Sequence, residues 1–225
     1  GANTVNGNRL TINLDTGTLP GVIFTLPGVW DIPLVGQNYT APLLTADGSR
    51  ALLSSAVTDP ITGTPSTRIA VVNTLTGAQT GTTLTLPGEQ FGSRMASLDG
   101  SRALIVTSVY DGRTSTNNLR LAVIDTTTGA QTGATTTLIG FLNGGVLYSA
   151  DTTRAVVTAI SSNFNTTGVA TTQVAVIDTS AGNQVGATLT LTPDNGLTVL
   201  SANGVRALVN TSAQTVVLNT VNGSQ

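Results

Sequence analysis

The sequence predicts an all-β, β-propeller-like fold, with four-stranded antiparallel blades formed by four repeats of about 52 residues. Arg50, Arg102, Arg154 and Arg206 each lie 52 residues after the last, inside copies of one phrase. Thr, a β-branched residue that suits half-buried strands, is abundant throughout the chain. Short apolar runs alternate with turn signals, as in sandwiches, barrels and propellers. A repeat of this length with four strands favours a propeller with one blade per repeat.

The phrase around each arginine predicts a tight hairpin turn. It reads Ala-Asp-Gly-Ser-Arg-Ala-Leu at residues 46–52, and close variants occupy 98–104, 150–156 and 202–208. Asp or Asn followed by Gly between apolar runs is a strong turn signal, because these residues tolerate positive φ. We expect this turn to link the fourth strand of one blade to the first strand of the next repeat.

The remaining strands of each repeat follow from a second phrase. An Asx residue closes an apolar run, and Gly follows four positions later; the pairs are Asn73 and Gly77, Asp125 and Gly129, Asp178 and Gly182, and Asn219 and Gly223. This spacing indicates an Asx-turn followed by a left-handed residue. A further strand comes next, such as residues 82–86 or 187–191, and the last leads into the next turn, such as residues 146–149.

The predicted organisation is a single domain over residues 1–225. Residues 1–40 hold N-terminal strands and an aromatic insertion, and the repeats occupy 41–92, 93–144, 145–196 and 197–225. The segment between the first two strands of a repeat is long and polar at 58–67, 110–119 and 161–172, but short at 211–214. We expect the three long loops to form a rim on one face.

The two ends of the chain suggest how the fold closes. The last repeat ends at Gln225, before its third strand, while residues 3–7 repeat residues 219–223 letter for letter. An unpaired strand edge favours aggregation. The hypothesis is that the N-terminal strand completes the last blade, either within one chain or between chains by strand exchange.

The repeat phrases resemble a known family. Thr-Ala-Asp-Gly-Ser-Arg-Ala-Leu at residues 45–52 and Ala-Val-Ile-Asp-Thr-Thr-Thr-Gly at 122–129 are similar to YVTN-type, PQQ-like β-propeller repeats of bacterial and archaeal surface proteins. They also resemble Thr-rich arrays of exported actinobacterial, notably mycobacterial, proteins. The resemblance covers about residues 40–225. It implies a secreted or cell-surface protein, although these repeats are longer and fewer than is usual in that family.

The composition excludes many chemistries. The 225 residues include no Cys, no His and no Lys, so thiol nucleophiles, imidazole bases, Schiff-base lysines and His or Cys metal sites are ruled out. We therefore predict no catalytic residues, no cofactor and no tightly bound transition metal, and a protein that is not an enzyme. With a net charge of −2 and few charged residues, nucleic-acid binding has no electrostatic basis. No apolar run is long enough for membrane insertion. Any targeting segment is expected to lie outside this sequence.

Candidate interaction residues lie where the repeats differ. They are Trp30, Tyr39, Asp59, Tyr110, Asp111, Arg113 and Phe164. Loops of this kind are either a binding rim or merely solvated. Trp30 and Tyr39 either stack on a sugar or a protein partner, or pad the core. The aspartates of the repeats either bind a cation or serve as Asx-turn residues that pair with Arg across the hairpin in every copy.

Two classes of function remain open from the sequence. The first is a non-catalytic structural or interaction module of a secreted or cell-surface protein, acting as a spacer, an adhesive or a protein-binding propeller. The alternative is a glycan-binding, lectin-like propeller or a carboxylate-only glycan-active domain, because glycoside hydrolysis needs carboxylates but no His. The expected partner is a protein or a glycan at the loop rim.

Overall fold

The computed structural model describes residues 42–90, 95–161, 170–192 and 197–225, together with the backbone of five short strands before residue 33. These five are β1 (Thr4–Asn6), β2 (Arg9–Asn13), β3 (Thr18–Leu19), β4 (Val22–Ile23) and β5 (Val29–Ile32). Every regular element in the described part is a strand, so the all-β prediction is confirmed. A helix able to cross a membrane is therefore not found there.

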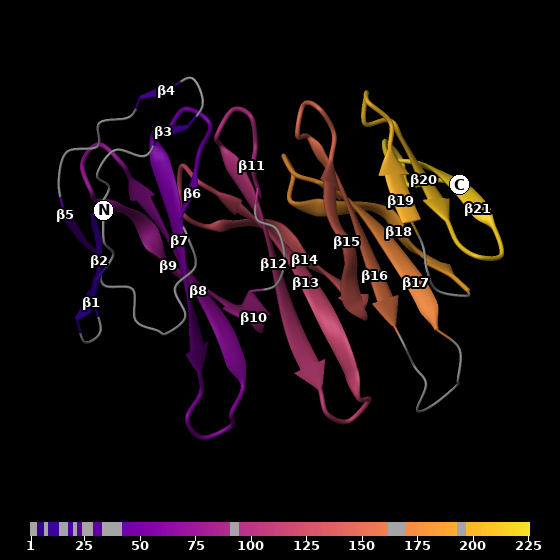
Figure 1. Cartoon of the computed structure of the whole chain (residues 1–225), viewed down its shortest axis with the longest axis horizontal. Coiled ribbons are helices and arrows are strands. Elements are labelled where there is room, and N and C mark those ends of the chain that lie inside the picture. The colour runs from indigo at the N-terminus through magenta and orange to yellow at the C-terminus, as the bar shows by residue number, and fades with distance from the viewer. Residues whose placement is uncertain are drawn as a thin grey trace.

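Four antiparallel sheets form the body of the molecule (Figure 1). The first sheet contains β6 (Leu43–Leu44), β7 (Arg50–Thr58), β8 (Pro65–Asn73) and β9 (Gln79–Pro87). The second contains β10 (Glu89–Gln90), β11 (Met95–Ala96), β12 (Arg102–Asp111), β13 (Thr116–Asp125) and β14 (Gln131–Ile139). The third contains β15 (Phe141–Tyr148), β16 (Arg154–Ser161), β17 (Thr171–Asp178) and β18 (Asn183–Leu191). The fourth contains β19 (Leu197–Leu200), β20 (Arg206–Asn210) and β21 (Thr215–Asn219).

Each sheet is a meander of neighbouring strands, as expected for a propeller-like blade. The turn that carries the repeated arginine lies inside a sheet, because β6 pairs with β7, β11 with β12, β15 with β16 and β19 with β20. The prediction that this turn connects two blades is therefore wrong. The strand before the turn is short in every sheet but the third, and its backbone groups are satisfied best by the strand that immediately follows in a hairpin.

The predicted long loops are strand at their two ends and turn in the middle, at residues 59–64 and 112–115, while residues 162–169 of the third lie outside the described residues. In the first sheet β7 and β8 stay in register out to the pair Thr58 and Pro65, and in the second β12 and β13 continue to Asp111 and Thr116. The polar composition of these segments suggested loops, but cross-strand hydrogen bonds need no apolar side chains. The result is two hairpin arms that extend beyond the sheets toward the same side (Figure 1). The short connection predicted at residues 211–214 is confirmed.

The core consists of three layers of side chains between successive sheets. The layer between the first two sheets contains Leu52, Ile69 and Val71 on one side and Ile105 and Ile124 on the other. Similar layers lie between the second and third sheets and between the third and fourth. Both faces of the second and third sheets are thus buried, which explains the continuous apolar runs of their central strands.

Paired glycines mark each of these junctions. Gly81 lies against Gly129, Gly133 against Gly182 and Gly186 against Gly223, all with positive φ. A Cβ on any of these six residues would collide with backbone atoms of the neighbouring sheet. The sheets therefore approach each other backbone to backbone, and these contacts fix their spacing and angle.

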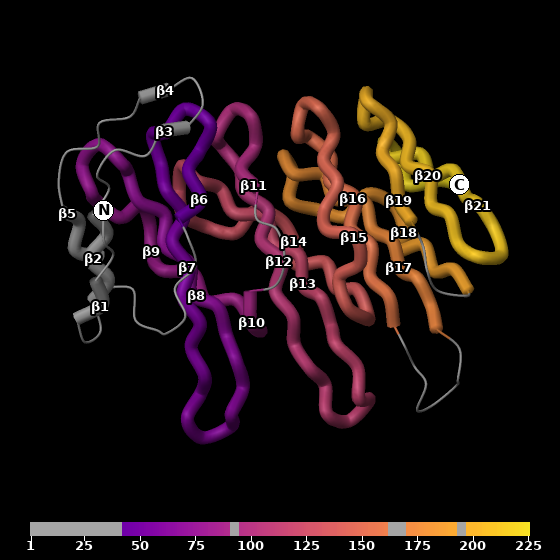
Figure 2. Tube along the Cα trace, viewed as in Figure 1, coloured from indigo at the N-terminus to yellow at the C-terminus, as the bar shows by residue number. Residues whose placement is uncertain are grey.

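The ring predicted from the two chain ends is not closed. β1 pairs with β2 and β2 with β5, in a separate three-stranded sheet, and no described N-terminal strand pairs with β21. The first and fourth sheets lie at opposite ends of an open row (Figure 2). Completion of the last sheet by the N-terminal strand of the same chain is therefore not present in this structure.

Candidate functional site

The repeated aspartates serve the turns. In the second turn Ser97 Oγ donates a hydrogen bond to Asp99 Oδ1 over 2.5 Å, and the same carboxylate oxygen accepts the Ser101 amide at 3.0 Å. Asp47 and Asp151 make the same contacts in the first and third turns. In the fourth, Asn203 replaces the carboxylate and its Oδ1 accepts the Val205 amide. The Asx-turn interpretation of these residues is confirmed.

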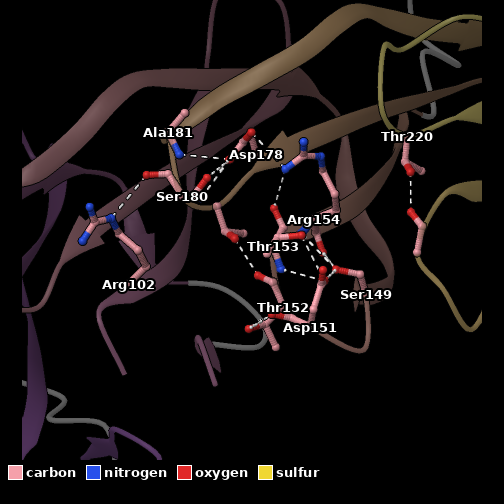
Figure 3. Close-up of polar contacts among 12 residues, drawn as sticks. Arg102, Ser149, Asp151, Thr152, Thr153, Arg154, Asp178, Ser180, Ala181 and Thr220 are labelled. Carbon is pink, nitrogen blue, oxygen red and sulfur yellow. Dashed lines mark hydrogen bonds and ion pairs between the residues drawn. The ribbon is translucent and has the colours of Figure 1, made fainter. Parts of the chain in front are cut away.

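Ion pairs across the hairpin occur in two of the four sheets. Arg102 pairs with Asp125 at 3.0 Å and Arg154 with Asp178 at 2.9 Å. Figure 3 shows Arg154 directed toward Asp178, which also accepts hydrogen bonds from Ser180 and Ala181. The prediction that such a pair is present in every copy is wrong, because Asn73 and Asn219 occupy the carboxylate position opposite the other two arginines.

A buried threonine closes each hairpin, and sequence reasoning missed it. The residue after each strand-ending Asx is Thr74, Thr126, Thr179 or Thr220. The hydroxyl of Thr126 donates to the Gly100 carbonyl over 2.5 Å, and the Thr126 amide donates to the Ser101 carbonyl at 3.0 Å. The other three threonines make the equivalent bonds. The signal was a Thr at this position in all four repeats.

The predicted rim residues lie at the tips of the hairpin arms. Asp59 caps the first tip by accepting the amides of Ile61 and Thr62, both at 2.8 Å. In the second arm Tyr110 is exposed near the end of β12, and Asp111 accepts the Arg113 amide at 2.9 Å. These hydrogen bonds lower the pKa values of Asp59 and Asp111, so both carboxyls stay ionised. The tips therefore combine ionised turn carboxylates with exposed apolar side chains, Ile61 and Tyr110.

The structure describes no side-chain position for the remaining predicted residues, Trp30, Tyr39 and Phe164. Trp30 lies in β5, where its backbone pairs with Ile12 of β2, and the structure does not describe its side chain. Tyr39 and Phe164 lie outside the described residues. The structure thus groups Tyr110, Asp111 and Arg113 on one tip and places Asp59 on another. Within the described ranges, no group of carboxylates is arranged to hold a metal ion.

A pocket of about 250 Å³ lies between the third and fourth sheets. Asn143, Gly144 and Gly145 form its wall on the β15 side, and Leu197 and Thr198 form its wall on β19. The residues that line it include no ionisable and no aromatic side chain. Sugar-binding sites commonly use an aromatic face, so this pocket gives no support to a glycan site.

An apolar face on the fourth sheet is the largest feature that sequence reasoning missed. Val199, Leu208 and Val217 are directly opposite one another across the three strands. All three are exposed, whereas Ala207, Val209 and Leu218 on the other face are buried against the third sheet. We name Val199, Leu208 and Val217 the open row. The available signal was the equivalence of this sheet to the first three, each of which buries the same face against the next sheet.

No protein-family model and no curated protein matches this chain. Among solved structures it is similar to the β-propeller domain of the Trilobed protease from Pyrococcus furiosus, with 11% identity over 76% of this chain and 48% of that one, and a TM-score of 0.43. Pyrococcus horikoshii acylaminoacyl peptidase is 11% identical over 76% of this chain and 27% of that one, with a TM-score of 0.45. A Mycobacterium tuberculosis puromycin-hydrolyzing peptidase is 20% identical over 90% of this chain and 32% of that one, with a TM-score of 0.39. The chain spans less than half of each of these proteins, and similarity at this level transfers no function.

The turn carboxylates predict a stability change at acidic pH. Hydrogen bonds from the Thr45 and Ser97 hydroxyls lower the pKa values of Asp47 and Asp99 from 3.8 to about 2. Their stabilising contribution is present above the unfolded value and is lost as pH falls through about 2. Because the chain has no His, we expect a nearly constant melting temperature from about pH 8 to pH 5 and a fall below about pH 4.

The control for this prediction removes the titrating groups but keeps the turn. Asn203 performs the same role in the fourth turn, so Asp47→Asn and Asp99→Asn should preserve the fold. Thermal unfolding of the double variant, followed by circular dichroism, is expected to show a smaller loss between pH 4 and pH 2. An unchanged loss would mean that these two carboxylates do not govern acid stability.

Proposed function

We propose that this chain is a non-catalytic structural or interaction module of a secreted or cell-surface protein. The observation that carries the proposal is the use of its polar groups. The aspartates of the described residues serve turns and ion pairs, whereas exposed apolar side chains include Ile61 and Tyr110 at the hairpin tips and the three residues of the open row. Such a surface favours contact with a protein.

The ionisation of the described aspartates argues against a role for them in the glycan-active alternative. A glycosidase needs a carboxylic acid whose pKa is raised, so that it can protonate the leaving group. All seven aspartates within the described ranges have lowered pKa values instead; they are Asp47, Asp59, Asp99, Asp111, Asp125, Asp151 and Asp178. Each is stabilised in its charged form by donors in its own turn. These groups are therefore suited to holding backbone and not to donating protons.

The extracellular assignment rests on the composition and the repeat type. A chain without cysteine is insensitive to the oxidising conditions outside a cell. The Thr-rich repeats resemble those of exported proteins. Low charge and rigid sheets suit a spacer that presents its hairpin tips to a partner.

The test combines location with ligand screening. We expect an antibody against this chain to label intact cells of the source organism, and we expect purified protein to give no signal on a glycan array and no turnover of aryl glycosides. Labelling only after lysis would refute the surface location. Glycan binding that is lost in Tyr110→Ala would establish a lectin instead, with Thr137→Ala, also exposed but on a different strand, as the matched control. Hydrolysis would refute the non-catalytic role.

A further inference from the structure

The fourth sheet has a free edge where each of the first three sheets has an outer strand. In those sheets β8, β13 and β17 each pair with a following strand, respectively β9, β14 and β18. β21 pairs with β20 on one side, and no strand in the described part of the chain pairs with its other side. An edge of this kind is a template for pairing with another polypeptide.

The backbone groups on this edge belong to Thr215 and Val217. The Asn219 amide donates to the Ser224 carbonyl, and the Asn219 carbonyl accepts the Gly223 amide. Ser224 and Gly223 lie in the turn that leads to the outer strand in the other sheets, so the Asn219 groups point away from β20. Backbone groups alternate in direction along an antiparallel strand, so those of Thr215 and Val217 also point away from β20. Two amides and two carbonyls thus face outward beside the open row.

The three outer strands show what kind of segment fits such an edge. None of them contains a charged residue. Each has a glycine with positive φ followed five positions later by a leucine; the pairs are Gly81 and Leu86, Gly133 and Leu138, and Gly186 and Leu191. The other positions are mainly threonine. The edge is therefore suited to an uncharged, Thr-rich strand with one glycine.

The register of the third sheet shows where the glycine falls. Val176, which corresponds to Val217, pairs with Val185 of the outer strand. The residue that corresponds to Thr215 pairs with Leu189, four positions later. The glycine lies in the bulge between these two pairs. The first two sheets have the same register, with threonine or leucine at the two paired positions.

The described N-terminal strands do not supply the outer strand of the fourth sheet. β1 and β5 pair with β2, and β3 pairs with β4. Each of these five strands thus has a partner of its own, and none of them pairs with β21. The edge of β21 is therefore open to a segment of another molecule.

We propose that β21 binds an extended, uncharged segment of another polypeptide as an added antiparallel strand. The segment has threonine or an aliphatic residue opposite Val217, glycine next to it, and threonine or an aliphatic residue opposite Thr215. In strand addition, main-chain hydrogen bonds give affinity and side chains at alternate positions give specificity. The proposal rests on the interaction role proposed above and deepens it, because it names a site and a class of ligand.

A polar pair beside the open row favours a single strand over a whole sheet as the occupant. Thr215 Oγ1 donates to Asn210 Oδ1 at 2.6 Å, and both residues are exposed. Their equivalents in the third sheet, Val174 and Thr158, are buried under the fourth sheet. A covering sheet would remove water from the Asn210 amide group at a free-energy cost. A strand added at the edge of β21 leaves that group in solvent.

Peptide binding tests the ligand class. The probe is a fluorescently labelled peptide with the sequence of residues 185–191, Val-Gly-Ala-Thr-Leu-Thr-Leu. We expect saturable binding to the purified chain, measured by fluorescence anisotropy. Replacing the peptide's glycine with valine should weaken binding about tenfold, because a left-handed backbone is unfavourable for a residue with a Cβ. A dissociation constant above about 1 mM, or equal binding of the two peptides, overturns the proposal.

Proline at position 215 tests the site. Thr215→Pro removes an amide that points away from β20, and an edge strand tolerates proline at such a position. Thr215→Ala keeps the amide and is the matched control, because both variants lose the hydroxyl that bonds Asn210. We expect about tenfold weaker peptide binding for Thr215→Pro and wild-type binding for Thr215→Ala, with unchanged circular dichroism spectra. Equal binding to the two variants would place the peptide elsewhere and overturn the proposal.

Amide exchange in the wild-type chain provides a readout that needs no variant. We expect the peptide to slow hydrogen exchange of the Thr215 and Val217 amides, followed by nuclear magnetic resonance, and to leave the Val216 amide, which points toward β20, unchanged. Unchanged exchange at Thr215 and Val217 overturns the proposal, whatever the proline variant does. Such a failure is distinguishable from failure of the proposed function, because cell labelling and glycan screening do not involve the peptide.

Discussion

Gly182→Ala is expected to lower the free energy of unfolding by about 2–5 kcal/mol. A left-handed backbone costs a residue with a Cβ about 1–2 kcal/mol, and forcing apart a packed contact costs about 1–3 kcal/mol more. Gly182 has φ +72°, and a Cβ there would collide with the Thr132 carbonyl of the neighbouring sheet. The substitution therefore disturbs both its own turn and the junction between the second and third sheets.

Two further glycines separate the cost of the left-handed backbone from the cost of the close contact between sheets. Gly63 has φ +68° but no atom lies within 4 Å of an added Cβ, so Gly63→Ala should cost only the backbone term of about 1–2 kcal/mol. Gly112 has open space and no positive φ, so Gly112→Ala should be neutral or slightly stabilising. Urea unfolding measures all three. Equal losses for Gly182→Ala and Gly63→Ala would show that the close approach of the sheets contributes nothing.

Thr126→Val is expected to destabilise the fold by about 1–3 kcal/mol, although it hardly changes the volume of the side chain. Thr126 is fully buried, and its hydroxyl donates to the Gly100 carbonyl in the turn of the same sheet. Valine leaves this buried carbonyl without that donor, and an unsatisfied buried polar group carries a desolvation cost of this size.

Matched threonine variants provide the control. Thr137 is exposed on β14, where Val suits a strand, so Thr137→Val should change stability by less than about 0.5 kcal/mol. Thr126→Ser keeps the hydroxyl and removes one methyl group, so it should cost about 0.8 kcal/mol. If Thr126→Ser were as destabilising as Thr126→Val, packing and not the hydrogen bond would explain the role of this residue.

The sequence predicted the local elements well because their signals are local. The Asp-Gly turn at Asp99, the Asx-turn at Asp125 and the left-handed Gly129 each depend on a few adjacent residues. The four-stranded sheets followed from counting the runs between these signals. Strand length was predicted less well: the polar arms near Asp111 and Thr116 pair through their backbone, and composition does not report backbone pairing.

Features that depend on contacts between repeats could not be predicted from one repeat. The Gly81 and Gly129 contact joins residues that are 48 positions apart, and neither has a side chain to suggest it. The open row has the same composition as its buried equivalents, so only its place at the end of the row reveals it. Of the predicted interaction residues, Tyr110, Asp111 and Arg113 do share one tip, but Tyr39 and Phe164 lie outside the described residues.

The uniform glycine junctions also have a genetic consequence. Because each junction uses the same pair of repeat positions, removing one whole period would join two compatible sheets. Excision of residues 102–153, for example, would place Arg154 directly after Ser101 and restore the same phrase. Unequal recombination between neighbouring copies would then lengthen or shorten the protein in whole-repeat steps. Length changes confined to the connection between the first two strands of a repeat leave the junctions intact, because Gly129 and Gly182 are 53 residues apart and Gly182 and Gly223 only 41.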